Sequence, residues 1–439
     1  MSDFQPFADL PRILDGPVEM NAPNEVIPIF EGIFHLLSDE INLEVRGKIL
    51  FSWVPYMGVK YEGVVTNDIY LHQMTAFRSV GKFDLKVSDQ IIAKVHLNNF
   101  QVSGTGEPIK VSGSTSGTTI IGDKSVSVDK VIFAIPNMRS FHGEPVAKGT
   151  SFTKGRLKFN TEDYIITIDQ HLDFKEKYEK LESQGGFILL WNGEIVKKSS
   201  SISHNELGSL LSALSKFLSF LNGRRCSPTF LQGMYDGLVV WTDYTGFMSD
   251  QYKYVISWPS EHSIEGIADL WQKFYEHWKV ENDRDVLNSI VHWYVEANSN
   301  SGFAEGSIIM IQTALELIYN WHLIEGKGLL TGRDAEAITA SNKIRLVLSD
   351  LKISKNFPPF CKTLKDIGTD DAPEAFVRIR NSIVHSQEEK RKKLNEIPGD
   401  AIVEAMYLGI WYIELMTLKI LNFKGKYRSR VSGAFSPVE

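Results

Sequence analysis

Apolar and polar positions alternate with a period of two through much of the first half of the chain. The alternation is clearest at Ile41, Leu43 and Val45, and it resumes beyond Gly47. Because successive side chains of a β-strand point to opposite faces, this pattern predicts half-buried strands. Strands are predicted in this way at residues 41–53, 58–65, 93–102, 124–135, 156–168 and 237–244.

Turn signals separate these predicted strands. Glycine and serine cluster in residues 112–117, and both residue types are common in turns. Asn192-Gly193 lies between apolar flanks and favours a tight hairpin, because both residues tolerate a positive φ. We therefore expect residues 1–258 to form a β-rich region, built as an antiparallel sandwich or a barrel.

One helix is expected inside this β-rich region, at residues 203–222. Apolar side chains recur there at a spacing of three and four residues, at Leu207, Leu210, Leu211, Leu214, Phe217, Leu218 and Leu221. This spacing places them on one face of an α-helix, which Gly223 can end in a left-handed turn.

After about residue 258 the two-residue period disappears and a helical period replaces it. Helices are predicted at residues 263–279, 285–297, 302–321, 343–351, 359–367, 371–387 and 400–423. The predicted fold class is therefore α+β. The β-rich region is followed by an all-helical domain over residues 263–430, with a boundary near residues 255–262.

Length and composition limit the possible classes of protein. A chain of 439 residues is too long for one ordinary domain. Cys226 and Cys361 are its only cysteines, which favours a reducing, cytoplasmic compartment, and we expect no secretory signal at the start. The most apolar stretch, residues 405–421, contains Glu414 and Lys419 and is short for a membrane span, so we expect a buried helix and no membrane partner.

Charge is distributed unevenly along the chain. Residues 351–433 carry 15 Lys or Arg and 10 Asp or Glu, a net +5, whereas the whole chain carries −7 and the remainder therefore −12. A basic end on an acidic protein permits a polyanionic partner such as RNA. A solvated basic surface explains the same charge equally well.

Candidate chemistry concentrates in the predicted helix at residues 371–387. Asn381 and His385 are four residues apart and so share a helix face, and Arg380 lies about 100° from Asn381 around the axis. Arginine can hold phosphate oxygens, histidine can transfer protons near neutral pH, and an amide can position both. These groups suit metal-independent cleavage of RNA, although a structural histidine is the alternative from spacing alone.

A single histidine cannot easily act as base and acid at once. A symmetric homodimer would place two copies of Arg380 and His385 across one groove and remove that difficulty. Attack by the internal 2′-hydroxyl would leave a 2′,3′-cyclic phosphate end.

The motif Arg380-Asn381-x-x-x-His385 resembles the signature of HEPN (higher eukaryotes and prokaryotes nucleotide-binding) domains. An earlier helix contains Thr313-Ala314-Leu315-Glu316-Leu317, where HEPN domains often carry an acidic residue, and residues 411–427 resemble their closing helix. The resemblance implies that Arg380, Asn381 and His385 form a ribonuclease site. Glu316 would support it by orienting Arg380, or would instead form a structural salt bridge.

The first half resembles the N-terminal region of ApeA-like abortive-infection proteins in three segments, residues 47–55, 217–220 and 237–241. This resemblance implies a toxin of antiviral defence, which damages host RNA once the N-terminal region senses a phage-derived trigger. Gln387 stands where some HEPN domains have a tyrosine that accepts nucleotides from a partner enzyme. That control mechanism is therefore not expected here.

Basic residues follow the motif directly, at Lys390, Arg391, Lys392 and Lys393. They could guide an RNA backbone toward the site, or form a solvated helix end. We find no zinc-ligand spacing and no nucleotide-binding loop, and expect no metal and no cofactor. The alternative function is a non-catalytic HEPN module for RNA binding or dimerisation, with a ligand-sensing N-terminal domain.

Overall fold

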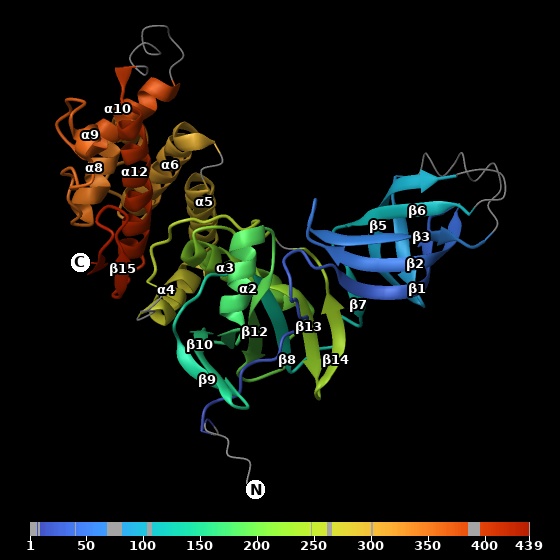
Figure 1. Ribbon diagram of the computed structural model, residues 1–439. Coiled ribbons are helices and arrows are strands. Elements are labelled where there is room, and N and C mark those ends of the chain that lie inside the picture. Colours follow the sequence, from blue (N-terminus) through green and yellow to red (C-terminus); the bar gives the residue numbers. More distant parts are fainter. Residues whose placement is uncertain are drawn as a thin grey trace.

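A computed structural model describes residues 7, 9–39, 41–67, 81–102, 108–246, 248–260, 266–299, 302–384 and 396–438. Figure 1 shows three parts in a row, with a barrel at one end, a second sheet in the middle and a group of helices at the other end. The β-rich part precedes the helical part along the chain, which confirms the predicted α+β fold class.

The barrel closes in the strand order β1-β2-β3-β6-β5-β4. Its strands are β1 (Ile27–Leu37), β2 (Asn42–Ser52), β3 (Gly58–Val65), β4 (Phe83–Val87), β5 (Gln90–Gln101) and β6 (Lys110–Ser116). In β2 the alternating residues Leu43, Val45 and Ile49 are buried, as their period predicts. Gly47 interrupts the alternation because a Cβ there would stand 2.0 Å from the carbonyl oxygen of Glu62 on β3.

The second sheet is antiparallel, with the strand order β7-β14-β13-β8-β12-β11-β10-β9. Its strands are β7 (Ile120–Gly122), β8 (Lys130–Pro136), β9 (Glu144–Lys148), β10 (Ser151–Asn160), β11 (Tyr164–Gln170), β12 (Leu189–Lys197), β13 (Thr229–Tyr235) and β14 (Leu238–Asp243). The barrel packs on it through aromatic contacts, with Phe51 and Phe230 at 4.8 Å between ring centroids.

Two predictions for this sheet were wrong. The single strand expected at residues 156–168 is a hairpin of β10 and β11. The hairpin expected at Asn192-Gly193 does not form, because β12 runs straight through both residues. Gly193 is required there for packing, since a Cβ would lie 2.2 Å from the ring of Phe133.

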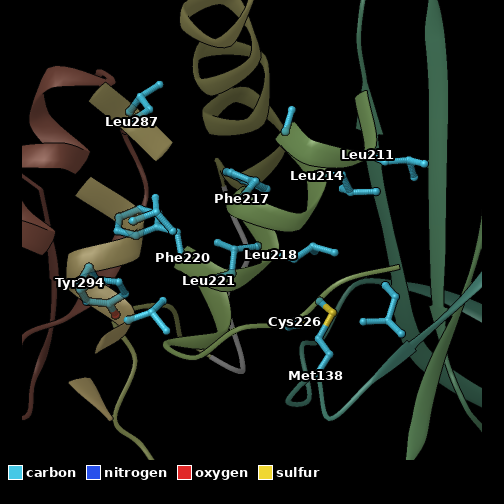
Figure 2. Close-up of a cluster of buried hydrophobic side chains, with 14 of the residues drawn as sticks. Met138, Leu211, Leu214, Phe217, Leu218, Phe220, Leu221, Cys226, Leu287 and Tyr294 are labelled. Atoms are coloured by element: carbon cyan, nitrogen blue, oxygen red, sulfur yellow. The ribbon is translucent and has the colours of Figure 1, made fainter. Parts of the chain in front are cut away.

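Two helices, α2 (Phe174–Gln184) and α3 (Leu207–Asn222), are inserted between strands of the second sheet. Helix α3 matches the helix predicted from its apolar spacing. Gly223 follows α3 with a left-handed φ of 73°. Figure 2 shows Leu211 and Leu214 pointing toward the strands, while Phe220 lies beside Tyr294 on the other side. Helix α3 therefore lies between the second sheet and the helical part, with its apolar face buried.

The helical part begins after Trp258. Its helices are α4 (Ile267–Lys279), α5 (Glu281–Asn298), α6 (Phe303–Tyr319) with a π-helical turn at Asn320–Glu325, α7 (Gly332–Ala337), α8 (Ala340–Asp350), α9 (Lys362–Lys365), α10 (Ala372–Val384) and α12 (Gly399–Ile420). The short strands β15 (Lys426–Arg428) and β16 (Phe435–Pro437) pair near the end of the chain.

Helix α12 is the central helix of this part and packs against α5, α6, α9 and α10. Among the described residues it is the one helix long and apolar enough to cross a membrane, but 78% of its most apolar window is buried inside the protein. This burial confirms the prediction of a buried helix.

A buried ion pair fixes the end of the chain to α12. The single Nε–H of Arg430 is shared between the two carboxylate oxygens of Glu414, each 2.9 Å from Nε, and Nη2 lies 2.8 Å from Oε1. Both side chains are almost fully buried. Tyr294 of α5 donates to the same carboxylate at 2.8 Å. Arg430 also donates to the carbonyl of Ile256 at 2.6 Å, so the pair holds the helical part to the segment that precedes it.

Candidate functional site

Helix α10, which carries Arg380 and Asn381, begins at a charged cap. The Asp371 carboxylate accepts a hydrogen bond of 3.1 Å from the backbone N–H of Glu374, as an N-cap residue does. Arg345 of α8 forms a two-pronged ion pair with the same carboxylate, at 2.7 and 2.9 Å. Burial alone would raise the pKa of Asp371, but Arg345 and the cap hydrogen bond outweigh it and hold that pKa below its usual range. The start of α10 is thus fixed to α8.

The buried face of α10 orients the rest of the helix. Phe376 and Ile379 are fully buried, and Ile383 packs partly against the same core, as the apolar spacing predicts. Val384 is 42% exposed and lies at the end of the described helix. Arg380 and Asn381, which are partly buried, therefore lie at the edge of this core.

Arg380 and Asn381 contact each other directly. The Nη1 group of Arg380 donates a hydrogen bond of 3.1 Å to Oδ1 of Asn381. Nε of Arg380 is buried and has no hydrogen-bond partner among the described residues. Within that part of the chain no carboxylate forms a salt bridge with Arg380, so its positive charge is uncompensated there.

His385 and the basic residues Lys390, Arg391, Lys392 and Lys393 lie outside the described residues. Their roles as proton donor or acceptor and as RNA-binding side chains stay predictions. The geometry of the site therefore rests on Arg380, Asn381 and their surroundings.

Glu316 lies on α6, which packs against α10 and α12. Its Oε1 accepts a hydrogen bond of 3.0 Å from Nε2 of Gln312, one turn earlier on α6. Among the described residues it pairs neither with Arg380 nor with another basic side chain. The described residues therefore show no ion pair through which Glu316 could orient Arg380. The side chain of Glu316 contacts Gln312 instead.

Arg378 has a separate structural role. Its Nη1 donates to the carbonyls of Ile367 and Gly368, at 2.8 and 3.4 Å, and the side chain is exposed. These contacts hold the segment after α9 against α10. Arg378 is thus a suitable control for experiments on Arg380.

The described residues contain no group of three or more His, Cys, Asp or Glu side chains that could hold a metal ion. They do contain a basic cavity of about 580 Å³ between α3 and α5, which was not predicted from the sequence. A signal for it existed in the sequence. Ser209, Ser212, Lys216 and Ser219 recur at a spacing of three and four on the polar face of α3, opposite the apolar stripe that predicted the helix.

Comparison with known proteins finds that the middle and the end of the chain are similar to two domains of one protein family. Residues 123–255 match the family model of the YopA central domain, and residues 280–439 match that of the YopA C-terminal domain. These ranges correspond to the second sheet without β7 and to most of the helical part. No solved structure matches the chain.

A curated relative matches almost the whole chain. The SPbeta prophage-derived uncharacterized protein YopA of Bacillus subtilis (strain 168) is 26% identical over 415 residues, which cover 93% of this chain and 92% of that protein. The descriptions of these matches mention neither HEPN domains nor ApeA, so the resemblance to both stays a prediction. The chain is similar to the YopA proteins, a phage-related family, in its central sheet as well as in its helices.

Proposed function

We propose that the helical part carries a metal-independent endoribonuclease site of the HEPN type, with Arg380, Asn381 and His385 as its catalytic residues. The observation that carries the proposal is the state of Arg380. Its guanidinium is oriented by Asn381 at the edge of the core, and no described carboxylate neutralises it. A preoriented and unpaired arginine suits the binding of a phosphate oxygen.

The chemistry divides among the three residues. His385 removes the proton of the 2′-hydroxyl, whose oxygen attacks the adjacent phosphorus while the bond to the 5′-oxygen breaks. Arg380 stabilises the charge that accumulates on the phosphorus oxygens, and Asn381 holds its guanidinium. A second His385 across a homodimer groove protonates the leaving 5′-oxygen. The products are a 2′,3′-cyclic phosphate and a 5′-hydroxyl.

A role in conflict between phages and their hosts is the biological part of the proposal. The similar protein of Bacillus subtilis is named as prophage-derived, which supports a phage-related role. An RNA-damaging toxin that acts in the cytoplasm of an infected cell, as in abortive infection, would protect neighbouring cells. The barrel and the second sheet would then sense the trigger.

The proposal is tested in cells that express the native chain or one of its variants during phage challenge. His385→Ala and Arg380→Gln should each abolish growth arrest, since removing one such transition-state contact costs about a hundredfold or more in rate. Arg378→Gln, two residues away on the same helix, should retain it. Unchanged growth arrest in folded His385→Ala protein would favour the non-catalytic binding module instead.

A further inference from the structure

The cavity between α3 and α5 lies where the second sheet meets the helical part. Its volume of about 580 Å³ falls within the range of small-molecule sites, which is roughly 300–1,000 Å³. One wall is the polar face of α3, and the opposite wall is α5 with Val291, His292 and Val295. Trp278 at the end of α4 and Met248 also line it.

Positive charge dominates the cavity lining. Lys216, Arg225 and Arg284 contribute cations, whereas Asp285 is the acidic residue in the described lining. Arg225 is held by Asp250 at 3.0 Å and by an ion pair with Glu296. Its charge is therefore partly neutralised from outside the cavity.

Lys216 differs from Arg225, because it has neither a hydrogen bond nor an ion pair with any described residue. The pKa of Lys216 is lowered, first by burial and then by the charge of the nearby Arg225. The pKa of His292 is also lowered, first by burial and then by the charges of Arg225 and Lys216. These three groups are thus close enough to disfavour one another's charged states. A bound anion would reverse that effect.

Unused hydrogen-bond donors accompany these cations. Ser209 and Ser212 are exposed on α3 and make no side-chain hydrogen bond to other described residues. Trp278 is 3% exposed, and its indole N–H has no hydrogen-bond partner in the described part of the chain. The two serine hydroxyls can therefore donate to a ligand in the cavity, whereas the Trp278 N–H is enclosed by the protein.

We propose that this cavity binds a phosphorylated small molecule of about the size of a nucleoside monophosphate. The phosphate lies beside Lys216 and the hydroxyls of Ser209 and Ser212, where cation and hydroxyl donors converge. The organic part contacts Trp278, Val291 and Met248, because a free phosphate would leave most of the volume empty. The site is formed by α3, α4 and α5 and uses none of the proposed catalytic residues.

Binding there would join two parts of the molecule. The junction already contains the Arg225–Glu296 ion pair and two hydrogen bonds from Asn298, to the carbonyls of Gly223 and Ile256. A ligand held between α3 and α5 adds contacts across this junction. It therefore raises the unfolding temperature in proportion to the logarithm of its concentration above Kd.

The test uses the full-length protein and isothermal titration calorimetry with AMP, GMP, CMP and UMP. Two kinds of control ligand are used. The four parent nucleosides lack the phosphate, and inorganic phosphate lacks the nucleoside. At least one monophosphate should bind with millimolar or tighter Kd, at least about tenfold more tightly than its nucleoside, because a charge-assisted contact is lost in the nucleoside. Failure of all four to bind, or equal binding of the nucleoside, would overturn the proposal.

Two variants locate the binding. Lys216→Gln removes the unpaired cation and should weaken binding of the monophosphate by about tenfold or more. Without ligand, its unfolding temperature should be unchanged or higher. Ser212→Glu, on the exposed part of the same face, should weaken it as well by charge repulsion and provides a result if Lys216→Gln fails to fold. Lys124→Gln removes an exposed lysine outside the cavity and should bind as the native chain does. Undiminished binding by a folded Lys216→Gln or Ser212→Glu protein would place the ligand elsewhere.

Discussion

Several side chains of this protein are held in states that differ from those in water, and their surroundings explain why. His171 is an example, since it is 8% exposed and accepts a hydrogen bond at Nδ1 from Lys177 at 3.1 Å. A lysine ammonium can only donate, so the proton of the neutral ring lies on Nε2 and is donated to Oδ1 of Asn192 at 3.0 Å. Asn192 was expected in a turn, and it is instead the strand residue that positions this histidine.

The pKa of His171 should make the stability of the second sheet sensitive to acid. Burial first, and then the charge of Lys177, lower that pKa below its ordinary value. As pH falls below about 6.5, the unfolded chain binds a proton at this position that the folded chain does not, so stability present above that pH is lost. Replacement by Gln in His171→Gln should reduce the fall in Tm between about pH 7.5 and about pH 5. An equal fall in the native and variant proteins would contradict this assignment.

The two cysteines should be chemically inert in the native protein. Cys226 and Cys361 are free and buried, and burial raises the pKa of each thiol to about 12. Only about one thiol in ten thousand is then a thiolate at pH 8. An aromatic disulfide reagent should modify both thiols in denaturant and neither on the same timescale in the native state. Rapid reaction of a native thiol would show that its surroundings open.

At the scale of elements, α12 shows why the helical part has one defined arrangement. Gly409 lets α6 and α10 approach it closely, since a Cβ there would lie 2.5 Å from Ile311 and 2.8 Å from Phe376. Glu414 on the same helix holds Arg430 and Tyr294 in an interior where neither is exposed. A small residue and a carboxylate within an apolar run thus have specific packing roles.

Breaking the Glu414–Arg430 pair should be strongly destabilising. Glu414→Gln leaves a buried guanidinium without a counter-charge and should cost about 3–5 kcal/mol, as should Arg430→Met for the reverse reason. The double variant removes both charges, so its loss in Tm should be smaller than the sum of the single losses. Calorimetric unfolding of the four proteins measures this coupling, and strictly additive losses would show that the pair is not what stabilises the junction.

The sequence predicts elements well wherever one face of an element is buried. The period of two located β2, β3 and β14, and the period of three and four located α3, α4, α6 and α12 to within a few residues. The same reasoning placed Phe376 and Ile379 of the candidate site in the core. It failed at Gly193, because a glycine that accommodates the ring of Phe133 and a glycine in a turn look alike in sequence.

At the scale of the whole molecule, contacts between distant segments could not be predicted from the sequence. Closure of the barrel depends on pairing of β1 with β4, for which neither strand carries a local signal. The basic cavity combines residues from α3, the loop after it and α5, so its charges become a cluster only in the folded chain. Glu316 shows the opposite case, because its contact is with Gln312, one turn earlier on α6, and not with Arg380 on a distant segment.

The arrangement in a row separates the proposed activities. Figure 1 shows the barrel and the helical part at opposite ends of the second sheet, which places the candidate ligand cavity between sheet and helices. The second sheet and the helices meet where α3 packs against α4 and α5 and where α4 packs against β10, so a signal received by the β-rich part would reach the helices through these contacts.

The most direct test of the account is RNA cleavage by purified protein in excess EDTA. The native chain should cut cellular RNA and leave 2′,3′-cyclic phosphate ends, Arg378→Gln should do the same, and Arg380→Gln and His385→Ala should each be slower by about a hundredfold or more. The comparison is made with phage lysate present and absent, so that a trigger is supplied if one is needed. Cleavage that leaves only 3′-hydroxyl ends, or equal cleavage by native and His385→Ala proteins, would contradict the proposed site.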